Sequence, residues 1–305
     1  MATFPVLEQL PGGYFLEESP RGVMAVHGSV ATALHRVGFG PESDGHLRLS
    51  QLAGRRPLFE LDTPDETFLL RRFSHGGLLR WATGSRFLDA QRPFRELILS
   101  DELQRIGVAT PTIVAARARR RAGAGWTLDL LVRRVEDAVD LRQVLDEVRA
   151  GVLPRRALAG LVRAAGDLLR RLHGAGFMHR DLQPANLLVT RADLESTQPT
   201  LWVLDLDRSE FRPSLAEGER RRNLRRLLRR ILRDDQERGP SLARTDYARF
   251  MGAYDPEREG WKADWRAIVA DQRRGHGMHG AGWALERAFG RKNEAGAQAP
   301  DSAGS

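Results

Sequence analysis

The stretch "FMHRDLQPANLLV", residues 177–189, places His179, Asp181 and Asn186 in one short polar segment between two apolar ones. The preceding segment, residues 154–176, has an apolar stripe at helical spacing. Proline near its start and glycine near its end are the residues that favour helix boundaries there. The following "NLLV" reads as a short strand. The pattern therefore predicts a polar loop held between a long helix and a strand.

A second polar group follows the next apolar run. The segment "LWVLDLD", residues 201–207, reads as a further short strand and ends in Asp205 and Asp207. Phosphoryl transfer from a nucleotide needs one carboxylate that orients the attacking hydroxyl and accepts its proton. It also needs an amide oxygen and a second carboxylate that hold Mg²⁺. Asp181 fits the first role, Asn186 and Asp205 fit the metal-binding role, and His179 is expected to brace the loop.

These motifs resemble those of a known fold. The segment "HRDLQPAN" is similar to the catalytic loop of protein kinases, and "DLD" stands where those enzymes have D-F-G. The resemblance implies an α+β, two-lobed protein-kinase-like fold, with a β-rich N-lobe that contains one helix and a mostly helical C-lobe. It also implies ATP and Mg²⁺ as cofactors.

The rest of the chain suits this division. Strands are expected within 47–73, a helix over 92–107, a hairpin from 110–121 and 126–135, and further helices over 140–151 and 218–235. We therefore predict a nucleotide-gripping N-lobe over 1–135, in which residues 1–45 receive no assignment, and a helical C-lobe over 136–290. The tail, 291–305, lacks large apolar residues and is expected to be disordered.

The N-lobe must supply a cation to grip the nucleotide phosphates. The only lysines are Lys262 and Lys292, so this cation must be an arginine. The resemblance places Arg71 at the position of the usual strand lysine and Glu96 at that of its helix partner; Arg72 faces the other way by strand alternation. The alternatives are an exposed strand charge for Arg71 and a helix N-terminal acid for Glu96.

The phosphate-binding loop departs from the kinase pattern. The segment "LAGRRPLF" offers Gly54 alone, instead of G-x-G-x-x-G. Gly54 remains the predicted loop glycine, with Arg55 or Arg56 as compensating cations.

The segments that follow the "DLD" motif narrow the kinase class. No A-P-E motif is present, and a basic amphipathic helix follows instead. The lipopolysaccharide core kinases are the family that the chain resembles, most of all the 3-deoxy-D-manno-octulosonic acid (Kdo) kinases of Gram-negative bacteria. The resembling segments are "LLRRFSHGGLLR", "RPFREL", "GVATPTIVAA", "HRDLQPANLLV", "LDLDRS" and "NLRRLLRRI". The resemblance implies ATP-dependent phosphorylation of a Kdo hydroxyl on a lipid A precursor.

Composition bears on location and partners. The net charge is +8, which favours anionic partners, although the dominance of arginine is also typical of a GC-rich genome. No cysteine, signal-peptide pattern or apolar run of about 20 residues is present. We expect a cytoplasmic protein, peripheral on the inner membrane, that binds an anionic glycolipid and no nucleic acid; its oligomeric state is left open.

Two rival interpretations remain at this point. The chain is also compatible with another phosphotransferase, such as a heptose or antibiotic kinase or an atypical protein kinase. The poor glycine loop and the missing lysine are also what a non-catalytic pseudokinase scaffold would show.

Overall fold

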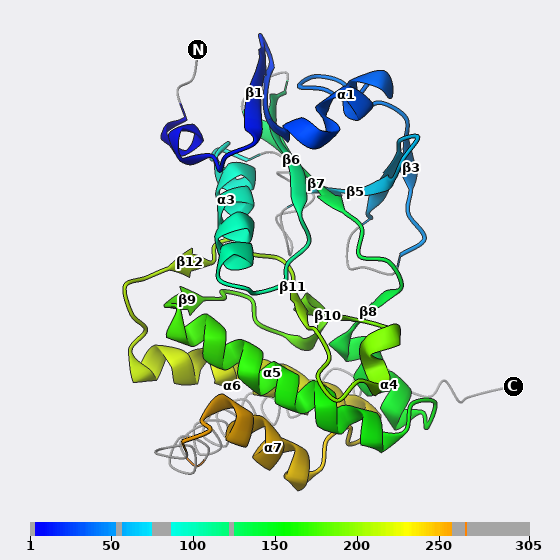
Figure 1. Ribbon diagram of the computed structural model, residues 1–305, viewed down its shortest axis with the longest axis vertical. Helices are drawn as coiled ribbons and strands as arrows, with labels where there is room; N and C mark the ends of the chain where they lie inside the picture. Colours follow the sequence, from blue (N-terminus) through cyan, green and yellow to red (C-terminus); the bar gives the residue numbers. More distant parts are fainter. Residues whose placement is uncertain (1–3, 53–56, 75–86, 122–124, 258–265, 267–305) are drawn as a thin grey trace, which may run out of the picture. The chain divides into compact units, whose positions relative to one another are not determined.

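The computed structural model describes residues 4–52, 57–74, 87–121, 125–257 and 266. The chain divides into a compact unit, Met1–Pro256, and a second unit, Glu257–Ser305, which lies almost wholly outside the described residues. Everything below concerns the first unit (Figure 1).

The first part of this unit is built on a seven-stranded sheet in which all neighbouring strands are antiparallel, in the order β1-β2-β6-β7-β5-β4-β3. Its strands are β1 (Tyr14–Ser19), β2 (Gly22–His27), β3 (Leu47–Leu49), β4 (Phe59–Asp62), β5 (Thr67–Arg72), β6 (Ile113–Arg120) and β7 (Trp126–Arg133). The β6–β7 hairpin, which the sequence predicted, forms the centre of the sheet.

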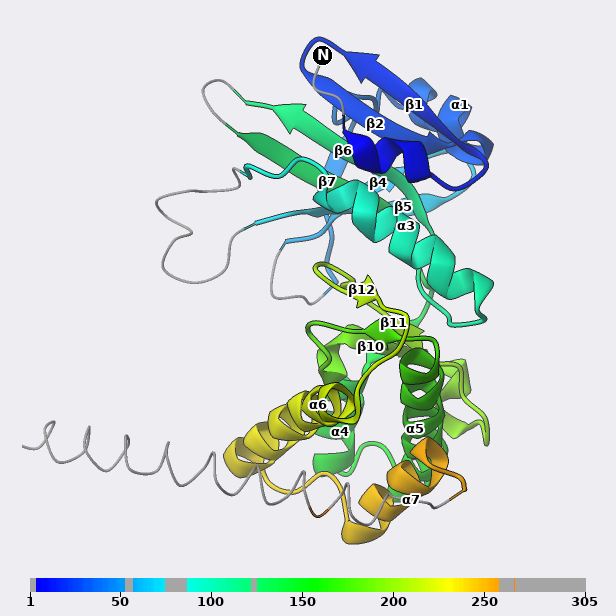
Figure 2. The same cartoon turned by 90° about the vertical axis from the view of Figure 1, so that its left-hand side faces the viewer.

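Each face of the sheet has its own helix and its own apolar core. Helix α3 (Arg92–Arg105), with the short 3₁₀ helix η1 (Pro5–Gln9), covers one face through Phe94 and Leu97 (Figure 2). Helix α1 (Gly28–Arg36) covers the other face through Val30 and Leu34. Both helices bury apolar stripes, which is the main source of stability for helices of this length.

Strand β5 shows how the sheet sorts its side chains. Phe68 and Leu70 are fully buried in the core beneath α1, which stabilises the fold by roughly 2 kcal/mol for each side chain. Because successive side chains of a strand point to opposite faces, Arg71 projects to the face that α3 covers. Arg72 projects back toward the α1 side, where it pairs with Asp44 and Asp129.

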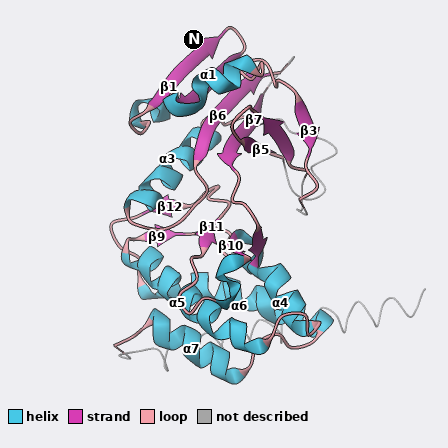
Figure 3. Ribbon diagram, turned by 45° about the vertical axis from the view of Figure 1, so that its right-hand side comes forward, coloured by secondary structure: helices cyan, strands magenta, loops and turns pink. Residues whose placement is uncertain are grey.

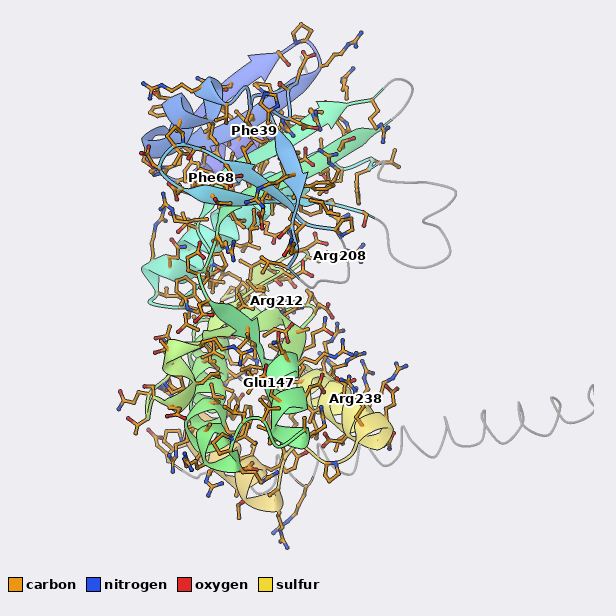
Figure 4. The ribbon with its side chains drawn as sticks, turned by 90° about the vertical axis from the view of Figure 1, so that its right-hand side faces the viewer. Phe39, Phe68, Glu147, Arg208, Arg212 and Arg238 are labelled. Carbon is orange, nitrogen blue, oxygen red and sulfur yellow. The ribbon has the colours of Figure 1, made fainter. Side chains whose placement is uncertain are left out.

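The second part of the unit is mostly helical (Figure 3). Its helices are η2 (Arg155–Ala157), η3 (Pro184–Asn186), η4 (Ala192–Glu195), α4 (Leu141–Arg149), α5 (Leu158–Gly174), α6 (Glu217–Arg238) and α7 (Arg244–Tyr254). Its short strands are β8 (Ala138–Asp140), β9 (Phe177–Met178), β10 (Leu187–Thr190), β11 (Trp202–Val203) and β12 (Glu210–Phe211). Helix α5 packs against α7. Salt bridges join α4 to α6. Glu147 lies near the end of α4 and Arg238 at the end of α6 (Figure 4).

The turn after α5 sets the start of the polar loop. Gly176 adopts a positive φ of 75°, and a Cβ there would lie 2.0 Å from the carbonyl oxygen of Arg212. Only glycine tolerates both conditions at low cost. The close approach lets β9 pair with β12, so the polar loop begins from a fixed strand.

The predicted fold class, a two-lobed kinase-like α+β fold, is confirmed. The structure adds elements in the segment 1–45, to which the sequence analysis assigned none: β1, β2 and a second helix on the sheet, α1. The strand expected over 201–207 is shorter than predicted, because only Trp202–Val203 is strand and Asp205 has a φ of 57°. The expected tail, 291–305, lies outside the described residues.

Candidate active site

His179 holds the polar loop from within. Its side chain is fully buried; Nε2 donates to the carbonyl oxygen of Leu204 at 3.0 Å, and Nδ1 accepts from the backbone N–H of Asp181 at 3.2 Å. This pattern requires the neutral imidazole, and burial accordingly lowers the pKa of His179. The bracing role predicted from the sequence is confirmed.

Asp181 projects from this braced loop with its side chain 49% exposed. Gln183 Nε2 donates to Asp181 Oδ2 at 2.7 Å, and Asn186 Nδ2 lies 3.4 Å from the same oxygen. Oδ1 receives no hydrogen bond from the described residues; its nearest cation is Arg226, whose Nη1 lies 3.7 Å away. One carboxylate oxygen is thus held and the other is open to an incoming hydroxyl.

Asn186 is oriented by the same loop. Its Nδ2 donates to the carbonyl oxygen of Asp181 at 2.7 Å, which directs the amide oxygen Oδ1 elsewhere. Within the described ranges this oxygen accepts no hydrogen bond. The backbone N–H of Leu204 donates to the carbonyl oxygen of Asn186 at 2.9 Å, so the strand that leads to Asp205 runs beside Asn186.

Arg71 joins the sheet to the "DLD" segment. Its Nη1 donates to Asp205 Oδ1 at 2.7 Å, and its Nη2 donates to Glu96 Oε2 on α3. Burial acts against the charge of Arg71, but the carboxylates of Glu96 and Asp205 outweigh it and raise the pKa. Burial raises the pKa of Glu96 to about 7 although Arg71 opposes this shift.

Helix α3 holds the rest of the "DLD" segment. Glu96 Oε1 accepts from the backbone N–H of Leu206 at 3.2 Å, and Arg92 forms an ion pair with Asp207. Asp205 and Arg208 both have positive φ angles, 57° and 62°, which costs energy for residues other than glycine. The contacts with α3 maintain this strained backbone.

A series of hydrogen-bonded polar side chains supports the polar loop. Asn223 on α6 donates through Nδ2 to the carbonyl oxygen of His179 at 2.6 Å and accepts at Oδ1 from His173 Nε2 at 3.0 Å. His173 Nδ1 accepts from the Tyr254 hydroxyl at 2.8 Å. Burial lowers the pKa of His173 to about 4, so the imidazole is neutral. Three helices thereby fix one backbone carbonyl.

The structure thus brings most of the predicted site residues together. Arg71, Glu96 and Asp205 form one cluster, Asp181 and Asn186 share one loop, and both Asp181 and Asp205 act electrostatically on His179. Gly54 lies outside the described residues. Sequence reasoning missed the roles of Arg92, Asn223 and Arg226, because their partners lie far away in the sequence and no local pattern marks them.

The cofactor requirement can be compared with these groups. In the described part of the chain, no group of three or more His, Cys, Asp or Glu could hold a metal ion. Asn186 and Asp205 supply one amide oxygen and one carboxylate. Such a small set suits Mg²⁺, which keeps several waters and completes its shell with substrate phosphates.

Comparison with known proteins identifies the chain. The model of the lipopolysaccharide kinase (Kdo/WaaP) family matches residues 49–254, which include the whole "HRDLQPAN" loop and the "DLD" segment. The chain belongs to this family. The Kdo/WaaP kinases are phosphotransferases, so the chain is an ATP-using kinase of lipopolysaccharide core biosynthesis that acts on a sugar hydroxyl.

Individual relatives agree with the Kdo/WaaP assignment. A 3-deoxy-D-manno-octulosonic acid kinase of Xanthomonas euvesicatoria is 32% identical over 222 residues, which cover 71% of this chain and 83% of the relative. The kinase of the same name from Stenotrophomonas maltophilia is 32% identical over 66% of this chain and 76% of its own length. A Vibrio vulnificus kinase of that name is 27% identical over 67% and 81%.

A solved structure shows the same fold. The structure described as WaaP in complex with acyl carrier protein superposes with a TM-score of 0.54 and 22% identity, covering 75% of this chain and 87% of that one.

Among the described helices, none is both long and apolar enough to cross a bilayer.

Proposed function

We propose that the chain transfers the γ-phosphoryl group of ATP to a hydroxyl of a Kdo sugar on a lipid A precursor, with Asp181 as the general base. The observation that supports this most strongly is the bridge from Arg71 to Glu96 and Asp205. It joins a strand cation, a helix carboxylate and a candidate metal ligand, which is the combination that phosphoryl transfer requires.

Asp181 would orient the acceptor hydroxyl and take up its proton as the new O–P bond forms and ADP leaves. Its open oxygen Oδ1 supports this role, because Oδ2 is occupied by Gln183. Electrostatic stabilisation and positioning supply most of the acceleration in such reactions. The rigid loop around His179 favours that positioning.

Asn186 and Asp205 would hold Mg²⁺, which neutralises charge on the β- and γ-phosphates. The unused Oδ1 of Asn186 and the 40% exposed carboxylate of Asp205 support this assignment. Arg71 would then keep Glu96 as its partner and turn Nη1 from Asp205 toward the nucleotide phosphates. Gly54 would contribute backbone N–H groups to the same phosphates.

The experiment combines purified protein with Mg-ATP and a Kdo-lipid A acceptor. Phosphate on the Kdo sugar supports the proposal. Phosphate only on a heptose or another acceptor would replace the sugar assignment, and nucleotide binding without turnover would identify a pseudokinase. Asp181→Ala should abolish turnover and keep ATP binding; equal loss of both would refute the role of Asp181.

The acceptor also bears on location. We propose that the exposed arginines of α6 hold the protein on the anionic inner face of the inner membrane, with roughly 1 kcal/mol of attraction for each basic residue near the surface. Flotation with vesicles that contain anionic lipid tests this. Binding that is absent, or that does not weaken with salt, would exclude the membrane surface as a partner.

A further inference from the structure

The arginines of α6 fall into two groups. Toward its C-terminal end they form ion pairs within the helix, Arg230 and Arg238 with Asp234 and Arg233 with Glu237. Arg222, Arg226 and Arg229 behave differently. Their spacing of four and three residues places them on one face of the helix.

Among the described residues, this face makes only long contacts with carboxylates. The one ion pair of Arg222 with a described residue is at 3.9 Å, to Glu219, and Arg229 makes none with the described residues. The side chain of Arg222 is 65% exposed. A row of guanidinium groups that form no close ion pair with a described carboxylate is therefore open to an anion.

Arg226 connects this row to the candidate active site. Its Nη1 donates to the carbonyl oxygen of Arg180 and lies 3.7 Å from Asp181 Oδ1. Its contacts with described residues all use Nη1, so its Nε and Nη2 are free of them. The side chain of Arg226 is 45% exposed. Its guanidinium is held through Nη1, so the edge formed by Nε and Nη2 is available beside the proposed base, Asp181.

Such an edge suits one kind of ligand. The planar guanidinium binds carboxylates and phosphates through two parallel hydrogen bonds, which gives geometric selectivity as well as energy. An anion bound there would also offset the charge of Arg226 while Asp181 takes up the hydroxyl proton. In this arrangement, the hydroxyl and the anion are two groups of the same acceptor molecule.

We propose that Arg226 binds an oxyanion of the acceptor, a carboxylate or a phosphate monoester, and thereby selects acidic acceptors and aligns their hydroxyl with Asp181. This inference rests on the proposed function, because it assumes that Asp181 is the base. Arg222 and Arg229 extend the same oxyanion-binding row along α6. The curated relatives are named for an octulosonic acid, which carries such a group.

The test compares Arg226→Ala and Arg226→Lys with Arg233→Ala. Arg233 is a matched control, since it is an exposed arginine of the same helix that pairs with Glu237. Steady-state rates are measured with Mg-ATP and three acceptors: Kdo-lipid A, its analogue with the Kdo carboxyl reduced to an alcohol, and its analogue without lipid phosphates. The KM for ATP is measured in parallel.

We expect Arg226→Ala to raise the KM for Kdo-lipid A about tenfold or more, with the KM for ATP within about twofold of wild type. Arg226→Lys should recover part of the loss, and Arg233→Ala should match wild type when the acceptor is dispersed in detergent, where no membrane surface contributes. The wild type should lose affinity for the analogue that lacks the bound group, and Arg226→Ala should lose nothing further on it. That analogue identifies the carboxylate or the phosphate as the source.

Equal KM values for Arg226→Ala and Arg233→Ala would overturn the inference. So would a loss for Arg226→Ala that is the same on all three acceptors, or a matching rise in the KM for ATP, because both would mean that Arg226 only holds the loop. Wild-type protein that does not phosphorylate Kdo-lipid A overturns the proposed function instead. The same comparison is then run on the acidic acceptor that the protein does phosphorylate and on the neutral analogue of that acceptor. Preference for a neutral acceptor would overturn both the proposed function and the inference about Arg226.

Discussion

Arg71 offers two nitrogens to two carboxylates on different elements, Glu96 on α3 and Asp205 in the loop after β11. A guanidinium can do this because its donors are fixed in a plane, whereas an ammonium is a compact point charge on a flexible stem. The side chain is therefore a rigid connector as well as a cation. Its neighbour Arg72 makes comparable contacts on the opposite face of the sheet.

We expect Arg71→Lys to lower kcat/KM by about 10- to 100-fold, or roughly 1.4–2.8 kcal/mol, because one ammonium cannot keep both partners and also meet the phosphates. Arg72→Lys is the matched control on the same strand; it should leave kcat/KM within about twofold and lower the thermal unfolding midpoint. Steady-state kinetics and thermal melts measure both effects. Similar kinetic losses in the two variants would argue against a phosphate-binding role for Arg71.

His173 supplies a pH dependence of stability. Its pKa is about 4 in the folded protein, against an ordinary value of 6.5, because it is buried. Between these values the unfolded chain binds more protons than the folded one, so the free energy of unfolding falls as the pH decreases. His173 therefore lowers the free energy of unfolding by about 2 kcal/mol when the pH falls from 7 to 5.

The variant His173→Gln isolates this effect, since glutamine can still accept from Tyr254 and donate to Asn223. Denaturant unfolding at pH 7 and pH 5 should show a larger loss for wild type than for the variant, by about 2 kcal/mol. The other titrating groups are common to both proteins. Parallel losses would mean that His173 does not carry the acid sensitivity.

Helices α5 and α7 meet at a glycine. A Cβ at Gly166 would lie 2.4 Å from the carbonyl oxygen of Phe250 and 3.0 Å from the Cβ of Ala253. We expect Gly166→Ala to lower the free energy of unfolding by about 1–3 kcal/mol, since the two helices must separate. The control is Gly252→Ala on α7, where no atom lies within 4 Å; it should gain up to about 1 kcal/mol from helix propensity. A gain in both variants would contradict close packing here.

At this scale the sequence predicted several elements from their apolar pattern and left β1, β2 and α1 unassigned, although β2 contains the apolar run "VMAV". Helix α5 and the β6–β7 hairpin follow directly from their patterns. Strand β1, "YFLEES", has no clear alternation, and it becomes a strand because β2 pairs with it. The apolar run 201–207 predicts a longer strand than Trp202–Val203. The strand stops early because the backbone N–H of Leu206 donates to Glu96 instead of to a neighbouring strand.

For the molecule as a whole, a ligand that binds the folded protein and not the unfolded chain should raise global stability. Mg-ATP at about 100 times its Kd should stabilise the protein by about 2.7 kcal/mol, which corresponds to roughly 5–10 °C in Tm. EDTA should remove most of this shift, and Asp205→Asn should lose its magnesium-dependent part. An unchanged shift in EDTA would exclude Asp205 as a required metal ligand.

The predicted site residues match the kinase motifs, whereas Arg92, Asn223 and Arg226 lie in segments that carried the family resemblance, "RPFREL" and "NLRRLLRRI", and were assigned no role. Arg71, Glu96 and Asp205 meet as the kinase resemblance implied. Arg92 meets Asp207 across 115 residues and Asn223 meets His179 across 44. A single sequence has no local signal for such distant pairs, because the packing of whole helices decides them.

The absence of lysine from residues 1–261 has a practical consequence for chemical labelling. Nucleotide-like reagents that mark kinases by acylating an amine need a nucleophilic lysine near the phosphates, and a guanidinium stays protonated and unreactive. We expect such reagents to leave Arg71 unlabelled even when they occupy the pocket. Surveys of bacterial lysates based on amine capture would overlook this enzyme, whereas reagents directed at arginine would detect it.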